Sequence, residues 1–271
     1  MPDSNALAPF SVRLADAIAA TGAPLCVGLD PDPDRMPPSL SGPEGVIEFC
    51  VAIAESTSPM AAAFKPNLAF FEALPDGWAL LEVVCEAVRE TGRLLVLDGK
   101  RGDIGNTGRR YAAALYDRLG GDAATVAPYM GADSIAPFVE HAGRCAFVLV
   151  ATSNPGAADL QHLDVDGRPL YRRVADLAAE VGAERAGDVG FVVGATRPAL
   201  LEDLREAHPD VPFLVPGVGA QGGSVGEVLA ANAGGPLLVN ASRSILYASA
   251  GPDYARAAGE AAERLAETLR R

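Results

Sequence analysis

Cysteine, histidine and aromatic residues are scarce in this 271-residue chain. There are four cysteines (Cys26, Cys50, Cys85 and Cys145) and three histidines. No two cysteines form a CxxC pair, and the histidines show no metal-ligand spacing, so the sequence argues against a zinc site and against a disulfide framework. Aromatic residues make up 6% of the chain and hydrophobic residues 49%. We therefore expect a core built mainly from Ala, Val and Leu.

Positive charge is also scarce, with 22 Lys and Arg against 35 Asp and Glu and a net charge of -13. Nucleic acids and anionic membranes bind through clustered Lys and Arg, so neither is expected as a partner. No apolar run approaches the roughly eighteen residues of a transmembrane helix. The N-terminal MPDSNALAPF lacks the basic and apolar regions of a signal peptide. We therefore expect a cytoplasmic protein that binds any anion with a few focused cations and backbone amides.

Short apolar runs recur along the whole chain, and each is followed by a polar or Gly-rich turn and an amphipathic stretch. The runs are continuous rather than strictly alternating, as in parallel strands that helices cover on both faces. Strands are predicted over 24–29, 61–65, 94–98, 123–127, 145–151, 189–194, 212–216 and 236–240. Helices are predicted over 44–57, 68–91, 107–120, 170–186, 198–207, 222–233 and 252–270.

This alternation predicts a single (β/α)8 barrel over residues 1–271, and a doubly wound open sheet is the alternative because it alternates in the same way. No linker divides the chain, and the segments 31–43 and 154–169 are interpreted as loops over the mouth of the barrel. The active site of such a barrel lies at the carboxyl ends of the strands. Polar residues cluster at these ends, namely Asp30, Lys65, Asn67, Asp98, Lys100, Ser153, Asn240, Ser242 and Arg243.

The densest polar group is LLVLDGKRGDIGNT, residues 94–107. Asp98 and Lys100 are two apart on a strand, so an extended chain would direct both side chains to one face. Asp103 follows in the turn that leads into the next helix. A solvated polar turn is the alternative, because Asp, Gly and Lys favour turns. The role of Ser153 has two alternatives as well, since this residue could bind a ligand or begin a turn.

Lys100 is expected to be charged. At an effective dielectric near 20, a carboxylate about 4 Å away favours the ammonium form by roughly 4 kcal/mol before desolvation is subtracted. A charged lysine suits a proton donor or an anion-stabilising group and argues against a Schiff base. Lys65 at the end of the second strand would complete a set of two cations and two carboxylates. Its charge argues against a magnesium ion at this place.

A glycine-rich segment, PGVGAQGGSVGEV, follows the seventh predicted strand. Gly217, Gly219 and Gly222 match G-x-G-x-x-G, but the motif lies near the end of the chain rather than in a first βαβ unit. Loops after the seventh and eighth barrel strands often bind phosphate, so the segment is interpreted as a phosphate cradle that opens a helix. Arg243 after the eighth strand could pair bidentately with that phosphate. An ordinary turn beside a surface arginine is the alternative.

Taken together, these motifs resemble the orotidine 5'-phosphate decarboxylase family. The run DGKRGDIGNT is similar to the family signature D-x-K-x-x-D-I-x-x-T, and its KRGDIG form resembles the longer bacterial subgroup. CVGLDP, FKPN, TSNPG, PGVGAQGG and ASRSI agree with the family in their order, so the resemblance spans about 25–246. The segment 157–169 is longer than in the short members of the family.

The resemblance implies a (β/α)8 barrel that dimerises near its mouths and converts orotidine 5'-phosphate to UMP in de novo pyrimidine biosynthesis, with no cofactor and no metal. It implies that Lys100 protonates C6, that Asp98 lies beside the departing carboxylate and that Lys65 orders the charges and contacts the ribose. Asp103 and Thr107 would reach into the partner subunit's site. The implied substrate-binding residues are Asp30 at the ribose, Asn67, Thr107, Ser153 at the pyrimidine, Gln221 and Arg243 at the phosphate, and Ser242.

Two other functions stay open. A magnesium-dependent sugar-phosphate decarboxylase or aldolase could share the Asp-x-Lys-x-x-Asp strand, although Lys65 argues against it. A non-catalytic binder of phosphoribosyl nucleotides is the second, although a binder has no need for two acids beside a substrate carboxylate.

Overall fold

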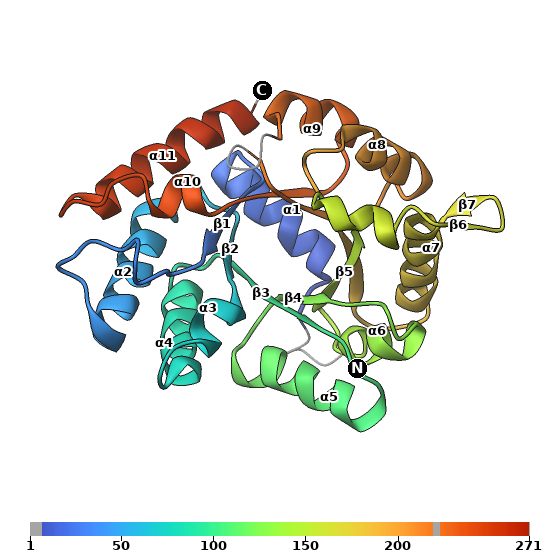
Figure 1. Ribbon diagram of the computed structural model, residues 1–271, viewed down its shortest axis with the longest axis horizontal. Coiled ribbons are helices and arrows are strands. Elements are labelled where there is room, and N and C mark those ends of the chain that lie inside the picture. Colours follow the sequence, from blue (N-terminus) through green and yellow to red (C-terminus); the bar gives the residue numbers. More distant parts are fainter. Residues whose placement is uncertain (1–6, 219–222, 271) are drawn as a thin grey trace.

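The computed structural model describes residues 7–218 and 223–270, and within them the chain closes into a parallel β-barrel surrounded by helices (Figure 1). The strands follow one another around the barrel in chain order, and the last pairs with the first, with Leu25 opposite Val239. They are β1 (Leu25–Leu29), β2 (Ala63–Pro66), β3 (Leu94–Arg101), β4 (Ala123–Val126), β5 (Cys145–Ala151), β8 (Asp188–Val193), β9 (Phe213–Pro216) and β10 (Leu237–Ala241). All eight predicted strands are confirmed. The closed (β/α)8 TIM barrel excludes the open sheet.

Helices connect the strands and cover the outside of the barrel. They are α1 (Phe10–Thr21), α2 (Gly42–Thr57), α3 (Leu68–Glu72), α4 (Gly77–Glu90), α5 (Gly105–Ala113), α6 (Ala132–Val139), α7 (Leu170–Ala183), α8 (Pro198–Ala207), α9 (Val225–Asn232), α10 (Arg243–Leu246) and α11 (Tyr254–Leu269). A π-helical turn (Ala114–Arg118) continues α5. No helix among the described residues is both long and apolar enough to cross a membrane.

One predicted helix, 68–91, is in fact two. The chain breaks between α3 and α4, where Pro75 is followed by Asp76 in the left-handed region (φ 53°). A Cβ atom at Gly77 would lie 1.7 Å from the Phe71 carbonyl oxygen, so α4 can begin this close to α3 only with glycine. The apolar periodicity continues through the break, which is why the sequence pattern does not reveal it.

Some elements are absent from the sequence prediction. They include the 12-residue helix α1 and two short helices, α6 and α10, of which α6 carries Pro137 inside it. The segment 154–169, predicted as a loop, holds a 3-10 turn (Pro155–Asp159) and a hairpin of β6 (Asp164–Val165) and β7 (Arg168–Pro169). Asp166 and Gly167 join the two strands with φ angles of 55° and 79°. An Asp-Gly pair at positive φ is typical of two-residue hairpin turns.

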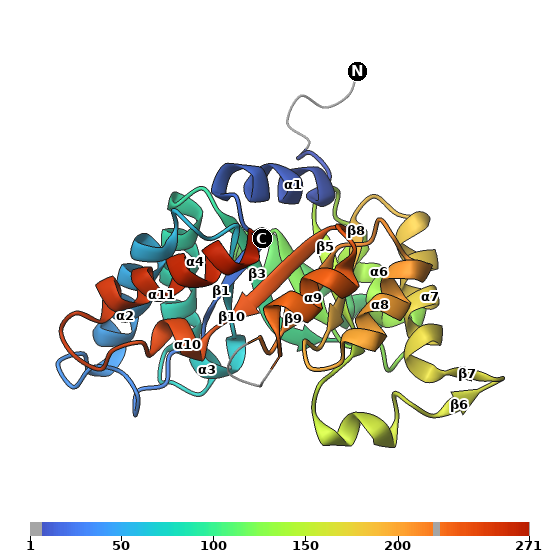
Figure 2. The same ribbon diagram turned by 90° about the horizontal axis from the view of Figure 1, so that it is seen from above.

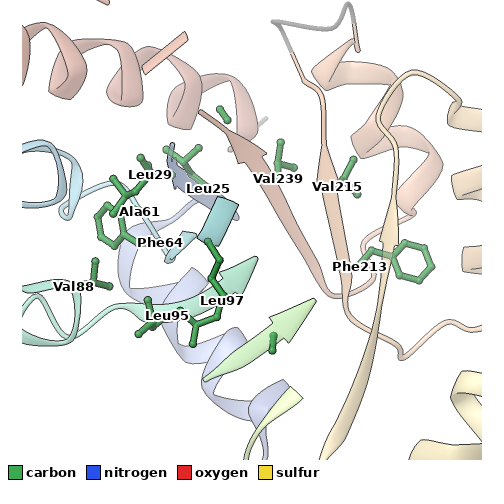
Figure 3. Packing of buried hydrophobic residues seen from close by; sticks show 14 of the residues in the cluster. Leu25, Leu29, Ala61, Phe64, Val88, Leu95, Leu97, Phe213, Val215 and Val239 are labelled. Atoms are coloured by element: carbon green, nitrogen blue, oxygen red, sulfur yellow. The ribbon is translucent and has the colours of Figure 1, made fainter. Parts of the chain in front are cut away.

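Side chains on successive strand residues alternate between two buried layers. The outer layer packs the strands against the helices, as Figure 3 shows for Leu25, Phe64, Leu95 and Val239. The inner layer fills the barrel with residues such as Cys26, Ala63, Val96, Phe147 and Leu238. The barrel is thus a packed core and not a pore.

Helix α1 closes one end of this inner layer. Phe10 and Leu14 are buried among the inward-facing residues, and the Phe10 ring meets Phe147 edge to face at 5.7 Å. Figure 2 shows α1 across one end of the barrel, with α3 and α10 at the opposite end. Because α3 and α10 follow β2 and β10 directly, the opposite end is that of the strands' carboxyl termini, and the polar residues gather there.

Candidate active site

The inward-facing register of the strands places polar side chains at the open end of the barrel. Asp30, Lys65, Asp98, Thr125 and Asn240 each lie two or four residues after an inward-facing core residue of the same strand. They therefore continue the inner layer to its carboxyl end, where polar groups replace Ala, Val and Leu. The barrel core ends in a polar floor.

Asp98 is the centre of this floor. Its Oδ2 accepts a hydrogen bond from Lys65 Nζ at 2.6 Å, and its Oδ1 accepts one from Lys100 Nζ, also at 2.6 Å. The Thr125 hydroxyl donates to the same Oδ1 at 2.9 Å and accepts from the Lys100 backbone N–H. The Lys65 and Asp98 side chains are 5% and 9% exposed, whereas Lys100 is 50% exposed. The Lys65 ammonium is thus buried against Asp98, and the Lys100 ammonium faces the open end of the barrel.

Lys65 and Lys100 are the only lysines in the sequence, and all the other residues in its total of 22 Lys and Arg are arginines. A flexible ammonium is a compact point charge that can give up a proton, which a guanidinium cannot do. Both lysines of the sequence thus lie in this floor.

The backbone at Lys100 is not extended. Lys100 has a φ of 46°, and the pairing of β3 with β4 shifts between Leu97 and Arg101. The assumption that an extended strand carries Asp98 and Lys100 to one face is therefore wrong, although their side chains do meet. A left-handed non-glycine residue is strained, and such strain is concentrated at functional sites.

Burial and charge oppose each other at the two buried groups. Burial alone would raise the pKa of Asp98, but the charges and hydrogen bonds of Lys65 and Lys100 outweigh it and hold that pKa well below its usual range. Burial alone would lower the pKa of Lys65, but Asp98 and Asp30 raise it above its usual range. Both groups are therefore charged at neutral pH.

Two adjoining cavities open over the floor. The larger, about 460 Å³, is lined by Asp30, Lys65, Asn67, Asp98, Ser242 and Arg243 among others. The smaller, about 320 Å³, is lined by Lys65, Asp98, Lys100, Thr125 and Ser153 among others. Because Lys65 and Asp98 line both, the ion pairs lie where the two halves of one cleft meet.

Several predicted binding residues are placed in this cleft by the close packing of strand ends. A Cβ atom at Gly28 would lie 1.9 Å from Ser242 Oγ, so the glycine of β1 makes room for that hydroxyl. Asn67 lines the cleft, and its Oδ1 accepts from the Ala69 N–H at the start of α3. Asp30 Oδ1 is buried and has no hydrogen-bond partner among the described residues. A buried acceptor of this kind is suited to a ligand hydroxyl.

Asp103 and Thr107 are not brought to the same cleft. In the described parts of the chain, neither residue lines the two cavities. Asp103 Oδ1 accepts from the Ile104 N–H, and Thr107 is exposed on α5. Gln221 lies outside the described residues, as do Gly219 and Gly222 of the glycine-rich segment.

The structure adds residues that the sequence patterns did not reveal. Thr125 could have been found, because it lies two residues after the inward-facing Ala123. Arg35 and Tyr247 also line the larger cavity. Arg35 belongs to the predicted mouth loop 31–43, and no local pattern connects it with Tyr247.

The geometry agrees with what comparisons with known proteins find. The model of the Orotidine 5'-phosphate decarboxylase / HUMPS family matches residues 23–258, which include all the polar strand ends above. The chain belongs to the orotidine 5'-phosphate decarboxylase / HUMPS family.

Relatives within the family are similar along most of their length. Orotidine 5'-phosphate decarboxylase of Roseiflexus castenholzii is 49% identical over 251 residues, which are 90% of this chain and 91% of that protein. The enzyme of that name from Variovorax paradoxus is 45% identical over 271 residues, with 96% and 97% covered. The solved structure of Leishmania donovani OMP decarboxylase has a TM-score of 0.82 and 38% identity, and it covers 97% of this chain and 99% of that one.

Proposed function

We propose that the protein is a carboxy-lyase that converts orotidine 5'-phosphate to UMP in de novo pyrimidine biosynthesis. The observation that carries this proposal is the Lys65–Asp98–Lys100 chain of ion pairs at the meeting point of the two half-clefts. The names of the relatives support the same substrate.

The chemistry needs a fixed cation at the reacting carbon. When the bond from C6 to the carboxylate breaks, CO2 leaves and the electron pair stays on C6, which has no conjugated electron sink. The Lys100 ammonium stabilises this pair and then donates a proton to C6, so that a C6–H bond forms and Lys100 becomes a neutral amine. Solvent then returns the proton. We propose that this proceeds without a cofactor.

In this proposal Asp98 positions the Lys100 ammonium and lies beside the departing carboxylate. Its contacts at 2.6 Å with both ammonium groups support the role, because they fix the donor before the substrate binds. Preorganised charge of this kind costs no reorganisation during the reaction.

The remaining substrate contacts distribute over the two half-clefts. We assign the ribose to Asp30, Lys65 and Asn67 in the larger half and the pyrimidine to Ser153 in the smaller half. Ser242 and Arg243 lie at the start of α10 and line the larger half, and with Gln221 they are assigned to the phosphate. Binding energy at the phosphate would hold C6 against Lys100.

A homodimer with shared sites is part of the proposal. Asp103 and Thr107 lie outside their own cleft, in a region where large apolar side chains are exposed. Ile104 is 50% exposed, and Tyr129 and Met130 after β4 are 87% and 47% exposed. Exposed apolar groups beside polar ones are typical of protein interfaces. A second copy seated here would bring Asp103 and Thr107 into its neighbour's cleft.

The magnesium-dependent alternative meets an obstacle in Lys65. Its buried ammonium already occupies one oxygen of Asp98, and Lys100 occupies the other. A dication at Asp98 would face two positive charges at close range.

The test is the decay of orotidine 5'-phosphate absorbance with and without EDTA. We expect turnover that the chelator does not change, and a loss of roughly 10²- to 10⁴-fold or more in Lys100→Ala, because both the proton and the charge are removed. Arg256→Ala, an exposed change on α11, is the control and should remain fully active. Full activity of Lys100→Ala would overturn the mechanism, and loss of wild-type turnover in EDTA would favour the metal-dependent alternative.

A further inference from the structure

Arg35 projects from the loop after β1 into the larger half of the cleft. Its guanidinium carbon lies 4.0 Å from the centre of the Tyr247 ring, and both side chains line the same cavity as Arg243. Within the described parts of the chain, Arg35 makes no ion pair. A guanidinium that lies over an aromatic ring and has no carboxylate partner keeps N–H groups that can bind an anion.

Tyr247 is a fixed platform for this arginine. Its hydroxyl donates to the Asp30 carbonyl oxygen at 2.7 Å and accepts from the Asp32 backbone N–H at 2.8 Å. Its ring stacks on buried Phe49, with centroids 5.9 Å apart. Tyr247 thus connects the loop after β1 with the end of α10, and it supports the Arg35 guanidinium that lies over its ring in the cleft.

The larger half-cleft holds few cations outside the ion-pair chain of Asp98. Its described lining holds three carboxylates (Asp30, Asp32 and Asp98) and three cations (Arg35, Lys65 and Arg243). Lys65 is engaged with Asp98. Without Arg35, Arg243 would be the one cation of this lining not engaged with Asp98, and a phosphate dianion would meet it beside the carboxylates of Asp30 and Asp32.

We propose that Arg35 is a second phosphate-binding guanidinium, held by Tyr247 in the cavity that Arg243 also lines, and that it selects a 5'-phosphorylated nucleoside over the free nucleoside. This inference rests on the proposed function for the identity of the nucleotide. The loop after β1 is then part of the recognition site and not only a rim of the barrel.

The test compares two ligands that differ only in the phosphate. Dissociation constants are measured for UMP by titration calorimetry and for uridine by its competition with UMP, in wild type, Arg35→Ala, Arg35→Lys and the control Arg256→Ala. Removal of one charge-assisted binding group predicts about 10- to 100-fold weaker UMP binding by Arg35→Ala, with uridine changed by less than about twofold. Arg35→Lys should recover part of the loss, and Arg256→Ala should match wild type.

Two results would overturn the inference. Unchanged UMP binding by Arg35→Ala would show that the arginine does not touch the phosphate. Equal weakening of UMP and uridine would show that Arg35 only supports the loop. Because binding of UMP is measured without turnover, a wild type that binds UMP but does not decarboxylate orotidine 5'-phosphate contradicts the proposed function alone.

Discussion

At Asp98 a single carboxylate is shared between two ammonium groups, one buried and one open to the cleft. The buried pair of Asp98 and Lys65 stays charged over a wide range of pH, since the pKa of Asp98 is lowered and that of Lys65 is raised. A buried pair of this kind adds little stability as a whole, but removing one partner leaves the other buried and uncompensated. We therefore expect Asp98 to matter for folding as well as for the proposed chemistry.

Asp98→Asn should lower the free energy of unfolding by about 3–5 kcal/mol at pH 7, because Lys65 keeps its charge but loses its partner. A carboxyl with a depressed folded pKa stabilises the fold above its unfolded pKa of about 4 and loses that contribution as pH falls toward the folded value. The difference in unfolding free energy between wild type and Asp98→Asn should therefore become smaller below about pH 4. Urea titrations of both proteins at pH 7 and pH 3 measure this difference.

The control for this change is Glu267→Gln, which removes an exposed carboxylate from α11 and should change the unfolding free energy by less than about 0.5 kcal/mol. If the gap between wild type and Asp98→Asn were as large at pH 3 as at pH 7, the assignment of a depressed pKa to Asp98 would be wrong.

Among the elements, helix α1 covers the end of the barrel that lies opposite the candidate site. It packs Phe10 and Leu14 into the inner layer and is anchored at its rim, where Arg13 pairs with Asp122 at 2.6 Å. The site lies at the other end of the strands. The helix that closes the barrel and the candidate site thus lie at opposite ends of the strands.

Phe10→Ala should destabilise the protein by about 3–5 kcal/mol, because it opens a cavity in the fully buried inner layer. The kcat and KM for orotidine 5'-phosphate at 25 °C should stay unchanged, since the cavity is remote from the cleft. Val12→Ala is a matched control, because Val12 lies in the same helix and is 49% exposed. Its unfolding free energy should change by less than about 0.5 kcal/mol. A large fall in kcat for Phe10→Ala would contradict the expectation that a cavity beneath α1 leaves the cleft unchanged.

In the whole molecule, the described barrel holds the ion pairs but leaves Asp103 outside the cleft. If that acid completes the partner's site, two inactive variants should complement each other. Mixing Lys100→Ala with Asp103→Ala subunits forms heterodimers in which one site is intact, so random exchange predicts about a quarter of wild-type activity. The measurement is specific activity after mixing under conditions that allow subunit exchange.

The control is a mixture of Lys100→Ala with the double variant Lys100→Ala/Asp103→Ala, in which no intact site can form. Activity in the control mixture, or no recovery in the complementing one, would count against shared sites.

The sequence by itself determined the strand and helix alternation, all eight barrel strands and the polar residues at their ends. Those features are local, because strand periodicity and the end of an apolar run depend on residues that are neighbours in the sequence. The close contact of Asp98 with Lys65 followed from them, because the carboxyl ends of adjacent parallel strands meet at one end of a barrel. The contact of Asp98 with Lys100 did not, because it forms on a strand whose backbone is bulged at Lys100.

Only the tertiary structure decided the closure of the barrel, the sealing of its base by α1, the bulged backbone at Lys100 and the contacts of Thr125 and Arg35. These depend on residues far apart in the chain, as with Tyr247 and Asp30, which are 217 positions apart and joined by one hydrogen bond. No local propensity records such a contact, because it forms only when loop closure brings the two ends of the barrel sheet together.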